Sequence, residues 1–139
     1  MTSQDAPAPA IDGEEFAEAV AETALDLLAF DTQNPPGETR DVVEWLEASF
    51  DALGLETQTH AVDPAKPNLL AALPGERDEV LCLNGPLDTV PFDAGAWAHD
   101  PLGERAGDRV YGRGATDMKG AVASMLAATR GYVESDATP

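Results

Sequence analysis

The stretch that decides the fold is Leu81-Cys82-Leu83-Asn84-Gly85-Pro86-Leu87-Asp88-Thr89-Val90-Pro91. It begins as an apolar run and ends in a turn-rich segment that carries an aspartate. This pattern is typical of a buried strand that delivers a functional group to the edge of a sheet. We therefore predict a buried strand over residues 79–84, with Cys82 as an inert thiol inside it and Asp88 just beyond its end.

A second stretch, Gly112-Arg113-Gly114-Ala115-Thr116-Asp117-Met118-Lys119-Gly120, places Asp117 where a glycine-rich turn becomes a helix. Taken alone, Asp117 is more simply an N-cap, and Asp88 a turn residue that bonds its own backbone. Together the two carboxylates predict one acidic site, of a kind that suits divalent metal ions. Because a zinc site needs about three or four ligands, including nitrogen or sulfur, metal binding stays open at this point.

The same glycines also suggest a phosphate-binding loop, but two observations disfavour it. A dinucleotide fingerprint would need a glycine at the position of Asp117, and no Gly-Lys-Ser/Thr motif is present. The charge of Asp117 would in addition repel a phosphate. We therefore rank a nucleotide or anion module last among the functions that this loop favours.

The rest of the chain alternates helical and extended patterns, which predicts an α/β fold of helices layered on a sheet. Asp12 followed by Glu15 indicates a helix start, whereas residues 1–12 are predicted to form a disordered acidic arm. The expected helices cover residues 13–30, 39–53 and 117–132. The expected strands cover residues 55–62, 68–73, 79–84 and 108–111, with an irregular loop over residues 93–107.

The composition narrows the function. The net charge is −18, from 26 acidic and 8 basic residues, which disfavours nucleic acids and anionic membranes as partners. Because the acids are scattered, they indicate a surface that stays soluble in concentrated salt, and hence a salt-loving source. The single cysteine excludes an internal disulfide. Neither a signal peptide nor an apolar run of membrane-spanning length is visible, so we expect a cytoplasmic protein.

Several motifs, in order and spacing, resemble the family of acetylornithine deacetylases, succinyl-diaminopimelate desuccinylases, aminoacylases and glutamate carboxypeptidases. The resemblance covers nearly all of the chain after the N-terminal arm. It rests on Asn34-Pro35-Pro36-Gly37, on the stretch from Asn84 to Pro91, on Trp97, on Asp100-Pro101-Leu102-Gly103, and on Tyr111 to Gly120. The resemblance implies a three-layer helix-sheet-helix, zinc-peptidase-like catalytic domain with a mixed sheet. Residues 13–139 would be its N-terminal portion, truncated before the C-terminal half and the family's dimerisation domain.

The resemblance also implies roles for single residues. Family members are hydrolases with two zinc (or cobalt) ions that cleave an amide next to a carboxylate. Asp88 matches the catalytic-site aspartate that orients a metal-binding histidine, and Asp117 matches the carboxylate that bridges the two metals. The histidine position itself holds Pro86, which has no donor atom, and His99, in the loop before Asp100-Pro101, is a candidate to replace that ligand.

The family's glutamate pair and late histidine lie further along than this chain extends. The function implied is therefore hydrolysis of small N-acyl amino acids or peptides, with this chain inactive alone. The alternative is a non-catalytic remnant that acts as a binding or assembly module.

Overall fold

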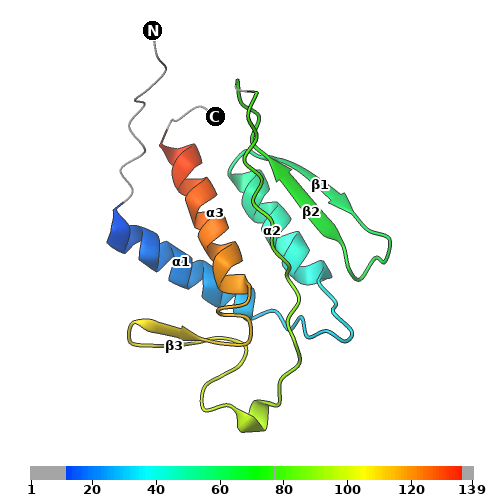
Figure 1. Cartoon of the computed structure of the whole chain (residues 1–139), viewed down its shortest axis with the longest axis vertical. Coiled ribbons are helices and arrows are strands. Elements are labelled where there is room, and N and C mark those ends of the chain that lie inside the picture. The colour runs from blue at the N-terminus through cyan, green and yellow to red at the C-terminus, as the bar shows by residue number, and fades with distance from the viewer. Residues whose placement is uncertain (1–11, 77, 136–139) are drawn as a thin grey trace.

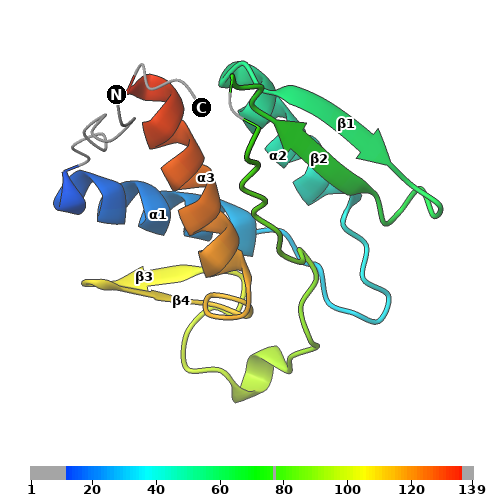
Figure 2. The same cartoon turned by 45° about the horizontal axis from the view of Figure 1, so that its top comes forward.

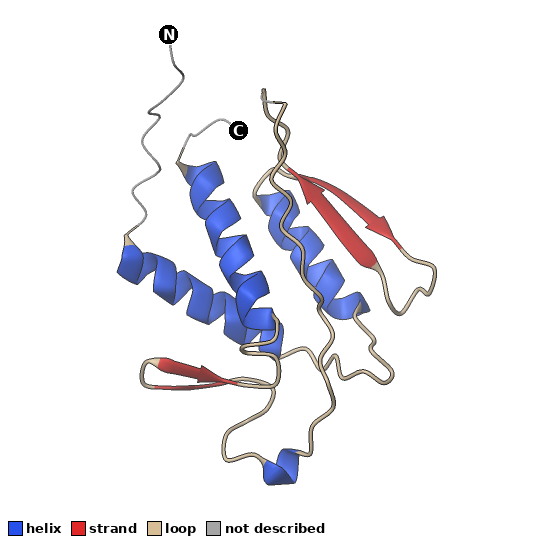
Figure 3. Cartoon of the chain, in the orientation of Figure 1, coloured by secondary structure: helices blue, strands red, loops and turns tan. Residues whose placement is uncertain are grey.

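The fold is described from a computed structural model, which describes residues 12–76 and 78–135. Its helices and short antiparallel strands confirm the predicted α/β class (Figures 1 and 3). In chain order the elements are α1 (Gly13–Leu28), α2 (Arg40–Ala52), β1 (Glu56–His60), β2 (Asn68–Ala72), the short 3₁₀ helix η1 (Ala94–Ala96), β3 (Glu104–Ala106), β4 (Arg109–Tyr111) and α3 (Lys119–Glu134). The arm predicted over residues 1–12 lies almost entirely outside the described residues.

Helix α1 begins where the sequence predicts. The Asp12 carboxylate accepts hydrogen bonds from the backbone N–H groups of Glu14 (2.8 Å) and Glu15 (3.3 Å), which satisfies two donors that the first helical turn leaves without partners. On the opposite end, Leu27 and Leu28 are fully buried. The helix therefore reaches the core at its C-terminal end, close to the candidate site.

The core lies where α1, α2 and α3 meet. Helix α3 crosses α1 and packs against it, and α2 contributes Val42 and Leu46 to the same core (Figure 2). The rings of Phe30 and Trp45 lie 6.3 Å apart at the edge of this core, as expected for a structural tryptophan. The buried apolar side chains at its centre are Ala24, Leu27, Val42, Leu46, Ala123 and Leu126.

The strands form two separate antiparallel hairpins. In the first, β1 pairs with β2 from Glu56↔Ala72 to His60↔Asn68. In the second, β3 pairs with β4 from Glu104↔Tyr111 to Ala106↔Arg109. Strand β3 falls in the loop that the sequence predicted to be irregular. The Arg105 guanidinium pairs with both carboxylate oxygens of Glu18, which ties this hairpin to α1.

The predicted buried strand over residues 79–84 is wrong. This segment is extended but belongs to no strand, and its side chains face solvent: Val80 is 88% exposed, Leu81 85% and Leu83 50%. Cys82 is also exposed, so it is not the buried thiol expected. A strand is buried by neighbouring strands and covering helices, and among the described residues none pairs with this segment.

Directly after residues 79–84, the chain again packs against the rest of the fold. Gly85 lies against Met118 and Val122 of the α3 region, and Leu87 packs on the core. An isolated parallel bridge then joins Gln33 to Thr89. The segment that carries Asp88 is therefore fixed at its C-terminal end, whereas its apolar start is open. Over residues 12–76 and 78–135, no helix is long and apolar enough to cross a membrane.

Candidate functional site

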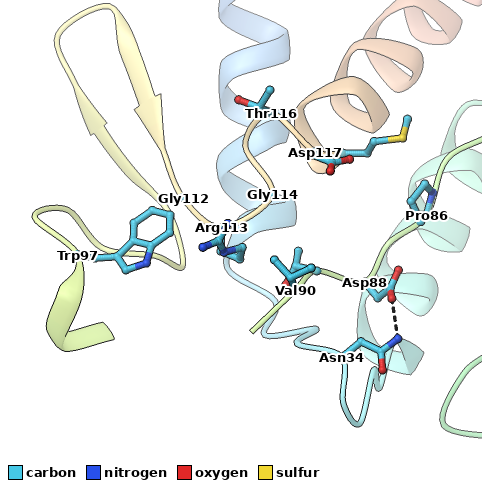
Figure 4. Close-up of a pocket in the computed structure, with 12 residues that line it drawn as sticks. Asn34, Pro86, Asp88, Val90, Trp97, Gly112, Arg113, Gly114, Thr116 and Asp117 are labelled. Carbon is cyan, nitrogen blue, oxygen red and sulfur yellow. Dashed lines mark hydrogen bonds between the residues drawn. The ribbon is translucent and has the colours of Figure 1, made fainter. Parts of the chain in front are cut away.

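A cavity of about 510 Å³ lies between the two sequence stretches that predicted the site (Figure 4). Asp88 enters it from the segment after the apolar run, and Asp117 enters it from the loop before α3. The structure thus brings together the two carboxylates that the sequence singled out. The lining residues are Asn34, Pro86, Asp88, Thr89, Val90, Trp97, Gly112, Arg113, Gly114, Thr116, Asp117 and Met118.

Asp88 is held by the turn that follows α1. The Thr89 N–H donates to the Thr32 carbonyl (3.0 Å), and the Asn34 N–H donates to the Thr89 carbonyl (2.8 Å). The Thr32 hydroxyl donates to the Leu87 carbonyl at 2.7 Å. The Asn34 side-chain amide then donates to Asp88 Oδ2 at 2.9 Å. The Asp88 carboxylate is therefore bonded to the Asn34 side chain, in a distant segment, and does not act as a turn residue that bonds its own backbone.

Asp117 is not the N-cap of α3. The cap residue is Met118, and no side chain caps this helix. The Asp117 side chain is exposed, and the peptide bond that joins it to Met118 is cis. The simpler interpretation of Asp117 as a helix cap is therefore wrong, and its carboxylate is free to face the cavity.

Two glycines bring the second stretch against the first. A Cβ at Gly114 would lie 2.8 Å from the Thr89 methyl group, and Gly114 has a φ of 96° that disfavours other residues. A Cβ at Gly112 would lie 2.8 Å from a Leu28 methyl group. The loop can therefore approach the Asp88 segment and α1 only because these positions lack side chains.

A buried lysine fixes the start of α3. Lys119 is 1% exposed, and its ammonium group donates to the Phe30 carbonyl at 2.7 Å. Burial lowers the pKa of Lys119 to about 8, and the nearby Asp31 carboxylate opposes this shift. This contact links the helix after Asp117 to the end of α1. This contact was not predicted from the sequence, because a lysine in a first helical turn is usually solvated.

Sequence analysis also missed three residues that shape the cavity. Asn34 anchors Asp88, and the Arg113 guanidinium lies over the Trp97 ring, 5.0 Å from its centroid. Each of the three lies in a motif quoted above, which could have drawn attention to it. Their roles were not predicted because their contacts join segments far apart in the sequence.

The described residues do not complete a metal centre. No group of three or more histidine, cysteine, aspartate and glutamate side chains gathers closely enough within residues 12–76 and 78–135 to hold a metal ion. Pro86 does line the cavity, at the position where the resemblance calls for a histidine, and it brings no donor atom.

His99 does not replace that histidine. Its Nδ1 lies 2.9 Å from Glu104 Oε1, and its ring stacks on Tyr111 at 3.7 Å between centroids. It is absent from the cavity lining. The hydrogen bond from His99 and the N–H of Asp100 lower the pKa of Glu104, so this cluster stabilises the loop before β3 rather than the cavity.

Fold and site together define an α/β unit in which two loops present two carboxylates to one cavity. Residues 82–139 match the model of peptidase family M20/M25/M40. This match confirms, over residues 82–139, the resemblance inferred from the motifs.

Curated relatives show the same similarity. A succinyl-diaminopimelate desuccinylase of Methylobacterium radiotolerans is 49% identical over 72 residues, which cover 51% of this chain and 18% of the relative. An acetylornithine deacetylase of Vibrio campbellii is 42% identical over 91 residues, covering 64% of this chain and 24% of the relative. A succinyl-diaminopimelate desuccinylase of Gluconobacter oxydans is 43% identical over 93 residues, with the same coverage. The chain thus spans about a quarter or less of the length of these relatives.

Proposed function

We propose that this chain forms one wall of the active site of an amide hydrolase that acts on small N-acyl amino acids or peptides. In this proposal Asp117 is a ligand of a divalent zinc or cobalt ion, and Asp88 is placed to orient a ligand at position 86, which Pro86 does not supply. The observation that carries it is that both carboxylates line one cavity, although they come from separate segments. The names of the relatives support the class of substrate.

The described residues alone provide no complete hydrolytic site. A bound ion would supply a Lewis acid and an activated water, but Asp117 is a single ligand where zinc needs about three or four. We therefore propose that this chain is not competent by itself. A cytoplasmic location remains a prediction, as does the absence of nucleic-acid and membrane partners, which rests on the −18 charge.

The test is calorimetric titration of the chain with zinc and with cobalt. We expect weak binding that Asp117→Asn reduces further and Pro86→His strengthens, because an imidazole adds a nitrogen ligand next to the two carboxylates. Asp26→Asn is the matched control, since it removes one exposed carboxylate on α1 that does not line the cavity. Equal zinc affinity in the parent chain, Pro86→His and Asp117→Asn would reject the site.

The alternative is a non-catalytic binding or assembly module, and Pro86 is the observation that favours it. The two functions differ in turnover. The chain is incubated with zinc or cobalt and an N-acetyl amino acid, and release of the free amine is measured. Turnover by the chain alone would reject both the alternative and our proposal that the chain is not competent by itself.

A further inference from the structure

One cation lines the cavity among the described residues, and it has no acidic partner. It is Arg113, whose side chain makes no hydrogen bond or ion pair with any described residue. Arg105, in contrast, is paired with both oxygens of Glu18. Carboxylates are abundant in a chain of net charge −18. An arginine that lines a cavity and pairs with none of them therefore needs an explanation.

The Arg113 side chain is nevertheless held in place. Its backbone N–H donates to the Pro101 carbonyl at 2.7 Å. Its guanidinium lies over the Trp97 ring at 5.0 Å, and the Phe92 ring packs edge-on against Trp97 at 6.3 Å. Stacking on an aromatic face orients a guanidinium and leaves its edge free for hydrogen bonds. The side chain is therefore preorganised without being neutralised.

The buried Nε atom of Arg113 has no hydrogen-bond partner. A buried donor without a partner destabilises the folded chain, and more so when the group is charged. The terminal nitrogens are neither buried nor bonded within the described part of the chain. Figure 4 places Arg113 between Trp97 and Val90, on the side of the cavity away from Pro86. The Arg113 guanidinium has already lost part of its hydration shell, so an anion that binds its terminal nitrogens has less water to displace.

We propose that Arg113, stacked on Trp97, binds the carboxylate of a small ligand whose other end lies toward Asp88 and Asp117. A planar guanidinium pairs with a carboxylate through two parallel hydrogen bonds. A singly charged carboxylate fits better than a phosphate dianion, because the two aspartates on the cavity wall would repel the second negative charge. The identity of this ligand as the substrate rests on the function proposed above, whereas the subsite itself does not require a metal.

The experiment is an NMR titration that follows the Trp97 indole N–H. The probes are N-acetylglycine and N-acetylglycinamide, which differ mainly in the charge of the carboxylate. We expect N-acetylglycine to shift this signal and to bind about tenfold or more weaker to Arg113→Gln, since a hydrogen bond to a charged group contributes about 1.5–3 kcal/mol. Arg113→Lys should bind with intermediate affinity, because it keeps the charge and loses the planar fork.

Arg130→Gln is the matched control, because Arg130 is exposed on α3 and does not line the cavity. Equal affinity for N-acetylglycine in the parent chain and Arg113→Gln would overturn the subsite, as would equal affinity for the acid and its amide. If circular dichroism shows that Arg113→Gln is unfolded, Arg113→Lys decides the question by the same criterion.

Each titration is repeated with zinc. A dependence on Arg113 that is the same with and without zinc supports the subsite, even if zinc binding fails and the proposed function with it. Zinc binding that depends on Asp117, combined with no effect of Arg113, would retain the function and reject the subsite.

Discussion

The segment over residues 79–84 and helix α3 are both rich in apolar side chains, yet the structure treats them in opposite ways. In α3, Ala123 and Leu126 are buried to 1% exposure or less, whereas Leu81 in the extended segment is 85% exposed. The helix satisfies its own backbone hydrogen bonds and needs only a surface for one face. An extended segment needs neighbours for its backbone as well as for its side chains.

The contrast can be tested by truncating one leucine in each region and comparing the change in the free energy of unfolding. The largest expected effect is for Leu126→Ala, which removes the three outer carbon atoms of a side chain that is buried in the core. We expect it to lower the free energy of unfolding by about 2–5 kcal/mol. Leu81→Ala should change that free energy by less than about 0.5 kcal/mol, because its side chain is already in water.

Denaturant unfolding, followed by circular dichroism in concentrated salt, measures both changes. An equal loss of unfolding free energy in the two variants would show that residues 79–84 are covered in solution. It would contradict the difference in burial between this segment and α3.

A second prediction concerns the close approach at the start of α3. A Cβ at Gly120 would overlap the Ala115 carbonyl oxygen, so Gly120→Ala should lower the free energy of unfolding by about 1–3 kcal/mol or more. Gly13→Ala is the matched control in the first turn of α1, where a Cβ meets no atom within 4 Å. Thermal unfolding compares them, and a Gly120→Ala variant as stable as Gly13→Ala would contradict the tight turn that carries Asp117.

A third prediction concerns the pH dependence of stability that the buried Lys119 at the start of α3 should cause. The pKa of Lys119 falls from 10.5 to about 8 on folding, so between these pH values the unfolded chain binds the extra proton. Stability should therefore rise with pH over this window, relative to a chain without the lysine.

Lys119→Met is the reference for this effect. Below pH 8 the buried charge disfavours the parent chain, and by pH 10.5 it should recover about 1–2 kcal/mol relative to Lys119→Met. Denaturant unfolding at pH 7 and pH 10, with a chelator present, gives the difference. A stability difference that is independent of pH would show that Lys119 is not buried as a cation.

The sequence predicted what is encoded locally. The Asp12 cap, the helix predicted over residues 39–53 and the strands predicted over residues 55–62 and 68–73 depend mainly on neighbouring residues, and the structure confirms them. It also directed attention to Asp88 and Asp117, which the structure brings to one cavity.

What the sequence could not predict depends on distant partners. Residues 79–84 have the pattern of a buried strand, but a pattern cannot state whether neighbours are present to bury it. The hydrogen bond from Asn34 to Asp88 and the stacking of Arg113 on Trp97 join segments that only the folded chain brings together. His99 likewise took its role from Glu104 and Tyr111 rather than from the cavity.

The central claim is that Asp88 and Asp117 face one pocket that attracts a divalent cation. The most direct measurement is paramagnetic broadening of backbone amide NMR signals by sub-stoichiometric Mn²⁺ in the parent chain and in Asp117→Asn. The account predicts that the amides of Asp88 and Asp117 broaden together, and that both effects weaken in the variant. Broadening spread evenly over the acidic surface, or confined to one of the two aspartates, would contradict it.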